Sequence, residues 1–75
     1  MVMLESDPRS ALTQREQQIL YLVACGMSNK EIARELSLSE QTAKTHLANM
    51  IAKSGRFNRA GLVTYGFETG VLRAC

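Results

Sequence analysis

Signals that start and stop helices recur along this chain and divide residues 12–70 into helical segments. Thr13 and Ser28 are each followed three residues later by a glutamate, which is the spacing of a capping box at a helix N-terminus. Apolar residues then recur with helical periodicity, and glycines follow the segments. No segment alternates between apolar and polar residues for long enough to predict a strand. The pattern predicts an all-α fold, a compact four-helix domain.

The caps give the expected bounds of these helices. Ser39 is expected to cap the third helix and Asn58 the fourth. With their caps, the helices are expected at residues 13–25, 28–36, 39–53 and 58–69. Their inward-facing residues are expected to be Ile19, Leu20, Val23 and Ala24, then Ile32, Ala33 and Leu36, then Ala43, Leu47, Met50 and Ile51, then Leu62, Val63, Gly66 and Phe67. Cys25 is expected in the same core, as a small apolar residue.

The first residues of the chain lack such a pattern. Residues 1–11 show no sustained periodicity and contain Asp7-Pro8, so we expect a flexible N-terminal stub or linker there, followed by a single domain at 12–75. No apolar run approaches the roughly 20 residues of a membrane span. The N-terminus does not resemble a signal peptide. A cytoplasmic location is expected.

The composition argues against catalysis and metal binding. The chain holds two cysteines, far apart, and a single histidine, without the spacing of a metal site. No carboxylate pair, nucleophile with an adjacent base, or glycine-rich phosphate loop is present. We therefore predict no catalytic residue, no metal, no cofactor and no enzyme activity. His46 is expected to pack at a helix interface, with a phosphate contact as the alternative, and Cys75 to be a free thiol.

The segment 28–53 pairs a short helix with a longer one across a tight turn at residues 37–39, which is the arrangement of a helix-turn-helix. Such a pair can brace its first helix on the DNA backbone and lay the second in the major groove. The net charge is +2, and between positions 39 and 59 the basic residues face a single acid, Glu40. These features predict binding to double-stranded DNA. The outward stripe of the longer helix is expected to be Gln41, Lys44, Thr45, Ala48 and Ala52.

In this region the chain resembles the LuxR-type (NarL/FixJ, GerE-like) DNA-binding domains. The resemblance covers about residues 12–72 and rests on Leu12-Thr13-x-Arg15-Glu16, on the run from Gly26 to Ala33, on Leu38-Ser39-Glu40-x-Thr42-x-Lys44-x-His46, and on Asn58-Arg59 with Gly70. It implies four helices, with the third in the major groove and the fourth commonly pairing two subunits. It also implies the output domain of a bacterial transcription regulator, such as a response regulator, usually at the C-terminus of a longer chain.

Two sets of site residues follow. The residues expected to contact DNA are Asn29, Lys30, Ser39, Gln41, Thr42, Lys44, Thr45, Ala48, Lys53 and Arg59. Lys53 and Arg59 are expected at phosphates. The residues expected in a homodimer interface on the fourth helix are Ala60, Gly61, Thr64 and Tyr65. Arg15 and Glu16 are expected to fix the first helix, through an ion pair with another helix, and contact with RNA polymerase is the alternative.

Some residues depart from the family pattern. Ala43 stands where the family prefers valine, and Ala48 where many members carry a polar or basic residue. Ser54 replaces a usual buried leucine, and Phe57 is expected to fill that space. These departures bear on sequence preference more than on the fold.

Two other functions stay open. One is a sigma-factor-like promoter-reading domain, since that fold also uses a compact helical module. The other is a protein-interaction or anti-activator module that has lost DNA binding. The start of a fourth helix at Asn58-Arg59, with Gly70 after it, favours the LuxR-type interpretation over the first. The small side chains of the outward stripe keep the second open.

Overall fold

The structure is a computed structural model and describes residues 1–74 of the chain. In chain order its elements are β1 (Val2–Leu4), α1 (Gln14–Ala24), α2 (Asn29–Glu35), α3 (Glu40–Ser54), α4 (Arg59–Glu68) and β2 (Leu72–Ala74). The prediction of a four-helix fold is confirmed. The expectation of a free thiol at Cys75 lies outside the described residues. None of the described helices is long and apolar enough to cross a membrane.

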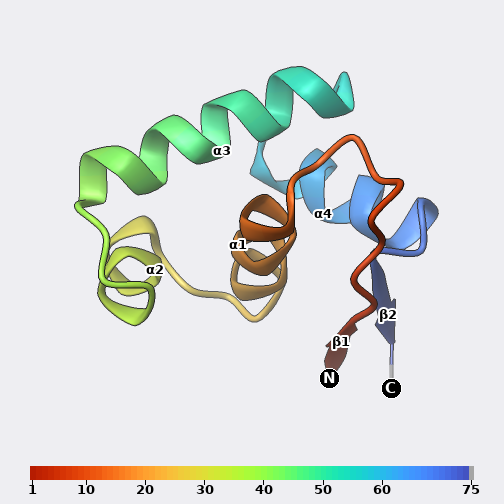
Figure 1. Cartoon of the computed structure of the whole chain (residues 1–75), viewed down its shortest axis with the longest axis horizontal. Coiled ribbons are helices and arrows are strands. Elements are labelled where there is room, and N and C mark those ends of the chain that lie inside the picture. The colour runs from red at the N-terminus through yellow and green to blue at the C-terminus, as the bar shows by residue number, and fades with distance from the viewer. Residues whose placement is uncertain (75) are drawn as a thin grey trace.

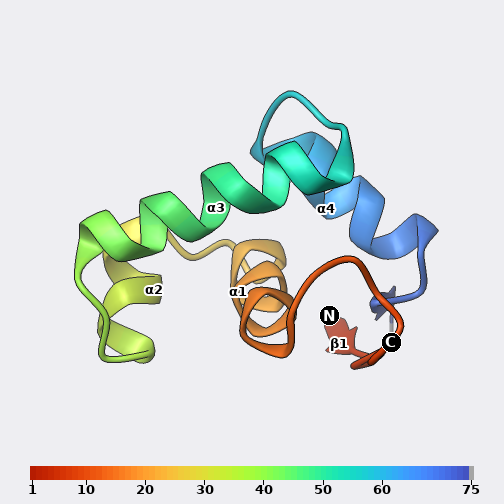
Figure 2. The same cartoon turned by 45° about the horizontal axis from the view of Figure 1, so that its top comes forward.

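Helix α3 is the longest element and lies along one side of the molecule. Helices α1, α2 and α4 all pack against its inner side, as the two views in Figure 1 and Figure 2 show. The outer side of α3 therefore faces away from the rest of the fold. This arrangement leaves one long helical face free for a partner.

The helix starts and stops are those expected from the sequence. Capping boxes join Thr13 to Glu16 and Ser28 to Glu31 by reciprocal hydrogen bonds. The side chains of Ser39 and Asn58 accept bonds from the backbone of α3 and α4. Helix α3 ends at Gly55 in the left-handed conformation that glycine adopts without strain. Each of these bonds joins residues within one helical turn, so local sequence predicts them.

A tight turn connects α2 and α3, as expected. Ser37 takes a positive φ of 57°, and the N–H of Leu38 donates to the carbonyl of Ala33 at 2.8 Å. The turn brings α3 back across α2, and the two helices pack together. The predicted helix-turn-helix geometry is present.

The core differs from the expected one at three residues. Phe67 and Cys25 are exposed, and Phe57 is 97% exposed instead of filling the space beside Ser54. Cys25 is the C-cap residue of α1 and follows Val23, the last buried residue of that helix. The fully buried Val71 and Leu72 cover the core beside α4, where Phe67 was expected. The buried apolar residues are Leu12, Ile19, Leu20, Leu22, Val23, Ile32, Ala33, Ala43, Leu47, Met50, Leu62, Val71 and Leu72.

Gly66 makes room for this C-terminal packing. A Cβ at Gly66 would stand 2.7 Å from the Cδ1 atom of Leu72 and 2.9 Å from the Cδ2 atom of Leu20. Both leucine side chains are fully buried and have little space to move. Glycine at this position therefore lets α4 pack closely against α1 and against Leu72, which follows α4 in the chain.

The expectation of no strand is wrong at both ends of the chain. β1 and β2 pair as a two-stranded antiparallel sheet, with Met3 opposite Arg73, and the two ends lie side by side (Figure 1). The segment expected to be a flexible stub therefore includes a paired strand. Three-residue strands are too short to produce a visible alternation. The pairing depends instead on the buried Leu72 and the half-buried Val2 and Leu4, which join the same core.

A buried glutamine joins the rest of this segment to α1. Gln17 is fully buried, and its amide donates to the carbonyls of Asp7 at 2.8 Å and Leu12 at 3.0 Å. Its side-chain oxygen accepts from the N–H of Asp7 at 2.9 Å. These bonds satisfy the buried amide and hold residues 7–12 against the first helix.

Candidate nucleic-acid interface

The outer face of α3 carries the side chains that were expected there. Gln41, Lys44, Thr45, Ala48 and Ala52 are all exposed. The opposite face, with Ala43, Leu47 and Met50, is buried. Because residues three and four positions apart share one side of a helix, the exposed residues form a continuous surface. We call Gln41, Lys44, Thr45, Ala48 and Ala52 the α3 stripe.

Hydroxyl groups organise the N-terminal turn of α3. The Ser39 oxygen accepts from the N–H of Thr42 at 3.0 Å and also shares a hydrogen bond of 2.7 Å with the Thr42 hydroxyl. One turn later, the Thr45 hydroxyl donates to the carbonyl of Gln41 at 3.0 Å. All four residues are exposed. The side chains expected to contact DNA here thus also hold the start of the helix.

One further polar residue lies on the same face and was not among the expected contacts. Asn49 is exposed, four positions after Thr45 and three before Ala52. An asparagine amide can donate and accept toward a base edge. The helical spacing from Thr45 was the signal that would have identified it.

On α2, the expected contacts Lys30 and Asn29 have different surroundings. Lys30 is exposed, and none of the ion pairs found in residues 1–74 involves it. Asn29 is half-buried, and its side-chain oxygen accepts from the Arg59 guanidinium at 2.6 Å. Arg59 also donates to the carbonyl of Met27. The Arg59 side chain therefore fastens α4 to the start of α2.

Lys53 also has a partner inside the protein. Its ammonium group lies 2.7 Å from the Glu16 carboxylate, whose side chain is only 5% exposed. The ion pair that was expected to join the first helix to another helix is therefore present, between Glu16 of α1 and Lys53 of α3. Arg15, which was expected to help fix the first helix, is exposed. Burial raises the pKa of Glu16. The hydrogen bond and charge of Lys53, together with the bonds from Thr13, more than offset this, and the pKa lies below its usual value.

This ion pair predicts a pH-dependent contribution to stability. Glu16→Gln should lower the free energy of unfolding by about 1 kcal/mol at pH 7, because glutamine keeps the capping bond to Thr13 but loses the charge pair with the partly exposed Lys53. A depressed pKa stabilises the fold above the unfolded-state pKa and loses that effect as the pH falls through the folded-state value. The difference between the variant and the parent should therefore shrink below about pH 4.3. Urea denaturation at several pH values tests this, and a difference that stays constant down to pH 2 would contradict it.

His46 lies in α3 between the buried and exposed faces and is half-buried, consistent with packing at a helix interface. No group of three His, Cys, Asp or Glu side chains within residues 1–74 is arranged to hold a metal ion.

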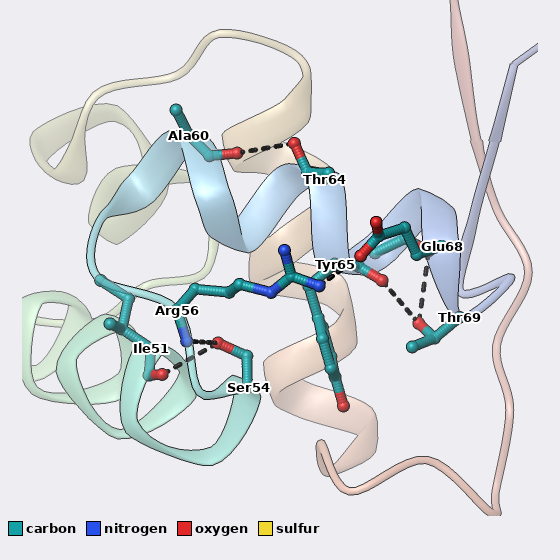
Figure 3. Close-up of polar contacts among 9 residues, drawn as sticks. Ile51, Ser54, Arg56, Ala60, Thr64, Tyr65, Glu68 and Thr69 are labelled. Atoms are coloured by element: carbon teal, nitrogen blue, oxygen red, sulfur yellow. Dashed lines mark hydrogen bonds and ion pairs between the residues drawn. The ribbon is translucent and has the colours of Figure 1, made fainter.

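The face of α4 that was expected to pair two subunits is divided in two. Ala60 and Thr64 are exposed, whereas Gly61 and Tyr65 are half-buried. The Arg56 side chain extends along α4 beside the Tyr65 ring, as Figure 3 shows, and Tyr65 also packs against the hydrophobic core. Its guanidinium carbon lies 6.0 Å from the centre of that ring, and the group binds Glu68.

The same arginine covers the start of α4. A Cβ on Gly61 would stand 3.2 Å from the Cβ of Arg56. The Ser54 hydroxyl holds the preceding turn, since it donates to the carbonyl of Ile51 at 2.9 Å and accepts from the N–H of Arg56 at 3.3 Å (Figure 3). Serine at position 54 therefore has a polar role where a buried leucine was the usual residue. The exposed part of the α4 face is left to Ala60 and Thr64.

Known proteins share this fold and sequence pattern. The family model described as "Bacterial regulatory proteins, luxR family" matches residues 10–65. The transcriptional regulatory protein MctR of Rhizobium johnstonii is 45% identical over 67 residues, which are 89% of this chain and 30% of MctR. The nitrate/nitrite response regulator protein NarP of Escherichia coli is 51% identical over 49 residues, 65% of this chain and 23% of NarP. The chain thus spans less than a third of these curated relatives.

Solved structures give the same result. The transcription factor GerE superposes with a TM-score of 0.79 at 35% identity, covering 83% of this chain and 92% of GerE. The response regulator ChrA of a heme-sensing two-component system also has a TM-score of 0.79, at 39% identity, covering 89% of this chain and 33% of ChrA.

Proposed function

The chain belongs to the luxR family of bacterial regulatory proteins, and we propose that it binds double-stranded DNA sequence-specifically, with α3 in the major groove. The observation that carries this proposal is the α3 stripe: a long helical face, exposed along its length, that no other element of residues 1–74 covers. The major groove of B-DNA is wide enough to admit such a helix. Helix α2 then lies beside it, with Lys30 free to meet the phosphate backbone. The proposed contacts are those expected from the sequence, with Asn49 added.

The internal bonds of three expected contacts bear on their roles. Asn29 and Arg59 bind one another, and Lys53 binds Glu16. Each would have to share or exchange its bond to reach a phosphate. Lys30 and Lys44 are exposed cations without such a bond, so we assign them the main electrostatic contacts.

A salt titration tests DNA binding. Affinity for a labelled duplex of random sequence should fall linearly with the logarithm of salt concentration, with a slope of about −0.9 for each phosphate neutralised. Two or three contacts per domain would give a slope of about −2 to −3. An absence of binding at low salt would overturn the proposal and support the interaction module that has lost DNA binding. The family match favours the LuxR-type interpretation over a sigma-factor-like domain.

We further propose that the chain acts as the output domain of a bacterial transcription regulator, and that it acts by binding DNA and not by catalysing a reaction. Its proposed location is the cytoplasm, where chromosomal DNA is available. The regulators MctR and NarP, whose names describe regulatory proteins, support this. RNA polymerase is the second proposed partner. Its contact would fall on the exposed Arg15, since Glu16 is buried and paired with Lys53.

A homodimer on DNA is proposed through the exposed part of α4. Ala60, Thr64 and Phe67 follow one another at spacings of four and three residues and so share one side of the helix. Two small residues allow close approach of a second helix, and the partly exposed Phe67 adds apolar area. In the proposed interface, Ala60, Thr64 and Phe67 take the central place that was expected for Gly61 and Tyr65, because Arg56 covers those two residues. A two-fold pair would set two copies of α3 about 34 Å apart, one turn of duplex.

The dimer predicts a selective effect of Thr64→Arg. A long charged side chain at the centre of the interface should abolish cooperative binding to a duplex with two half-sites, because the two helices could no longer approach. Binding to one half-site should be unchanged. Gel-shift titrations on single and double sites measure both. Ala11→Arg, which adds the same charge at an exposed loop residue, is the control and should keep cooperativity. Cooperativity that survives Thr64→Arg would move the dimer interface to another surface.

A further inference from the structure

The Thr45 hydroxyl on the outer side of α3 uses its proton inside the protein. A serine or threonine hydroxyl has a single proton to donate. The proton of Thr45 is given to the carbonyl of Gln41 at 3.0 Å. The Ser39 and Thr42 hydroxyls form one hydrogen bond with each other, at 2.7 Å between their oxygens, which uses one of their two protons. At Thr45, the groups left for a partner are therefore a methyl group and an accepting oxygen.

The centre of the α3 stripe is consequently rich in methyl groups and poor in donors. Thr45, Ala48 and Ala52 lie at spacings of three and four residues on the side opposite the buried Leu47 and Met50. Hydrogen-bond donors flank this line: the Gln41 amide one turn earlier, and Lys44 and Asn49 on either side. An isolated surface helix would carry more charge at these positions.

Among the base edges exposed in the major groove, that of thymine matches a methyl-rich surface. Among the four bases, only thymine places an apolar group there, its C5-methyl; the remaining features are hydrogen-bond donors and acceptors. We propose that α3 recognises thymine C5-methyl groups through the side chains of Thr45 and Ala48. The preferred ligand is a duplex half-site with thymines facing these two residues. The inference rests on the proposed insertion of α3 in the major groove.

Replacing thymine by deoxyuridine tests the inference directly, because uracil keeps the same hydrogen-bonding groups and lacks only the methyl. A half-site is first selected from a random duplex pool with the whole chain. Each thymine is then replaced singly by deoxyuridine. We expect a loss of affinity of roughly three- to fivefold at the positions that face Thr45 and Ala48, the effect of removing one methyl from an apolar contact. Equal affinity for every uracil-containing duplex overturns the inference.

Two variants of Thr45 separate its methyl from its hydroxyl. Thr45→Ser removes only the methyl and should lose roughly three- to fivefold in affinity. It should also become insensitive to deoxyuridine at the facing position, because the contact is already absent. Thr45→Val keeps a methyl, removes the hydroxyl, and should bind at least as well as the parent. The opposite result, in which Thr45→Val binds DNA weakly and Thr45→Ser binds it as the parent does, would overturn the inference. It would assign recognition to the accepting oxygen of Thr45.

The matched control is Thr69→Ser. Thr69 is exposed, and its hydroxyl donates to the carbonyl of Tyr65, four residues earlier, at 2.9 Å, as Thr45 does to Gln41. Because Thr69 lies at the end of α4, the substitution should not change affinity. An equal loss in this control would attribute the effect to helix stability and overturn the inference.

Failure of the inference can be told apart from failure of the proposed function. Binding of thymine and uracil duplexes with equal affinity and a steep salt dependence would overturn the thymine assignment alone. If no duplex binds at low salt, the proposed function fails, and the thymine assignment fails with it.

Discussion

Lys44→Ala should weaken binding to a DNA half-site by about 1–3 kcal/mol, which is roughly five- to 150-fold. Lys44 is exposed in the first half of α3, and no ion pair among residues 1–74 uses it. Its ammonium group can therefore reach a guanine edge or a phosphate without breaking a bond inside the protein. Fluorescence anisotropy with a labelled half-site at fixed salt measures the change.

The control for this prediction is Arg9→Ala, which removes one positive charge from an exposed residue outside the helices. It should change affinity only slightly, through the net charge. Both variants should keep the melting temperature and the helical circular dichroism of the parent. Equal affinities for Lys44→Ala and the parent at moderate salt would remove Lys44 from the interface.

Gln17→Leu should lower the free energy of unfolding by about 2–4 kcal/mol. Leucine has a similar size, but it leaves the N–H of Asp7 and the carbonyl of Leu12 without the bonds that Gln17 makes. The carbonyl of Asp7 also loses its bond from Gln17 but still accepts from the N–H of Ser10 at 3.1 Å. Each unsatisfied buried polar group costs about 1–3 kcal/mol. Asp7 is only half-buried, so water can restore part of the loss. Thermal and urea denaturation measure the effect.

The neighbouring substitution Gln18→Leu is the matched control. Gln18 is exposed, so its replacement should change stability by less than about 0.5 kcal/mol. Residues 7–12 of the Gln17→Leu variant should also become more accessible to proteases, because the bonds that hold them to α1 are lost. Equal melting temperatures for the two variants would show that the buried bonds contribute little.

The predictable part of this fold is the part that depends on neighbours in the sequence. The capping boxes at Thr13 and Ser28 and the stop at Gly55 each involve residues within about one helical turn. The α3 stripe follows from the helical period once Ala43, Leu47 and Met50 are recognised as apolar. For the same reason, the start and end of every helix were predicted to within about a residue or two.

The site was less predictable where a side chain has a partner far along the chain. Lys53 and Arg59 are basic residues near the groove helix, and their charge alone suggests phosphate contacts. The structure shows an internal partner for each, Glu16 for Lys53 and Asn29 for Arg59, which no pattern near these residues predicts. Similarly, Arg56 covers Gly61 and the Tyr65 ring, which on a helical projection look available to a second subunit.

The sequence by itself determined the four helices, the turn between α2 and α3, and the face that α3 exposes, because short-range hydrogen bonds and a regular period encode them. Only the tertiary structure decided that β1 pairs with β2 and that Val71 and Leu72 take the place expected for Phe67. It also decided that Gln17, a residue type usually found at the surface, is buried. These features join segments distant in sequence, and their free energy depends on which surfaces meet when the helices pack. No local pattern contains that information.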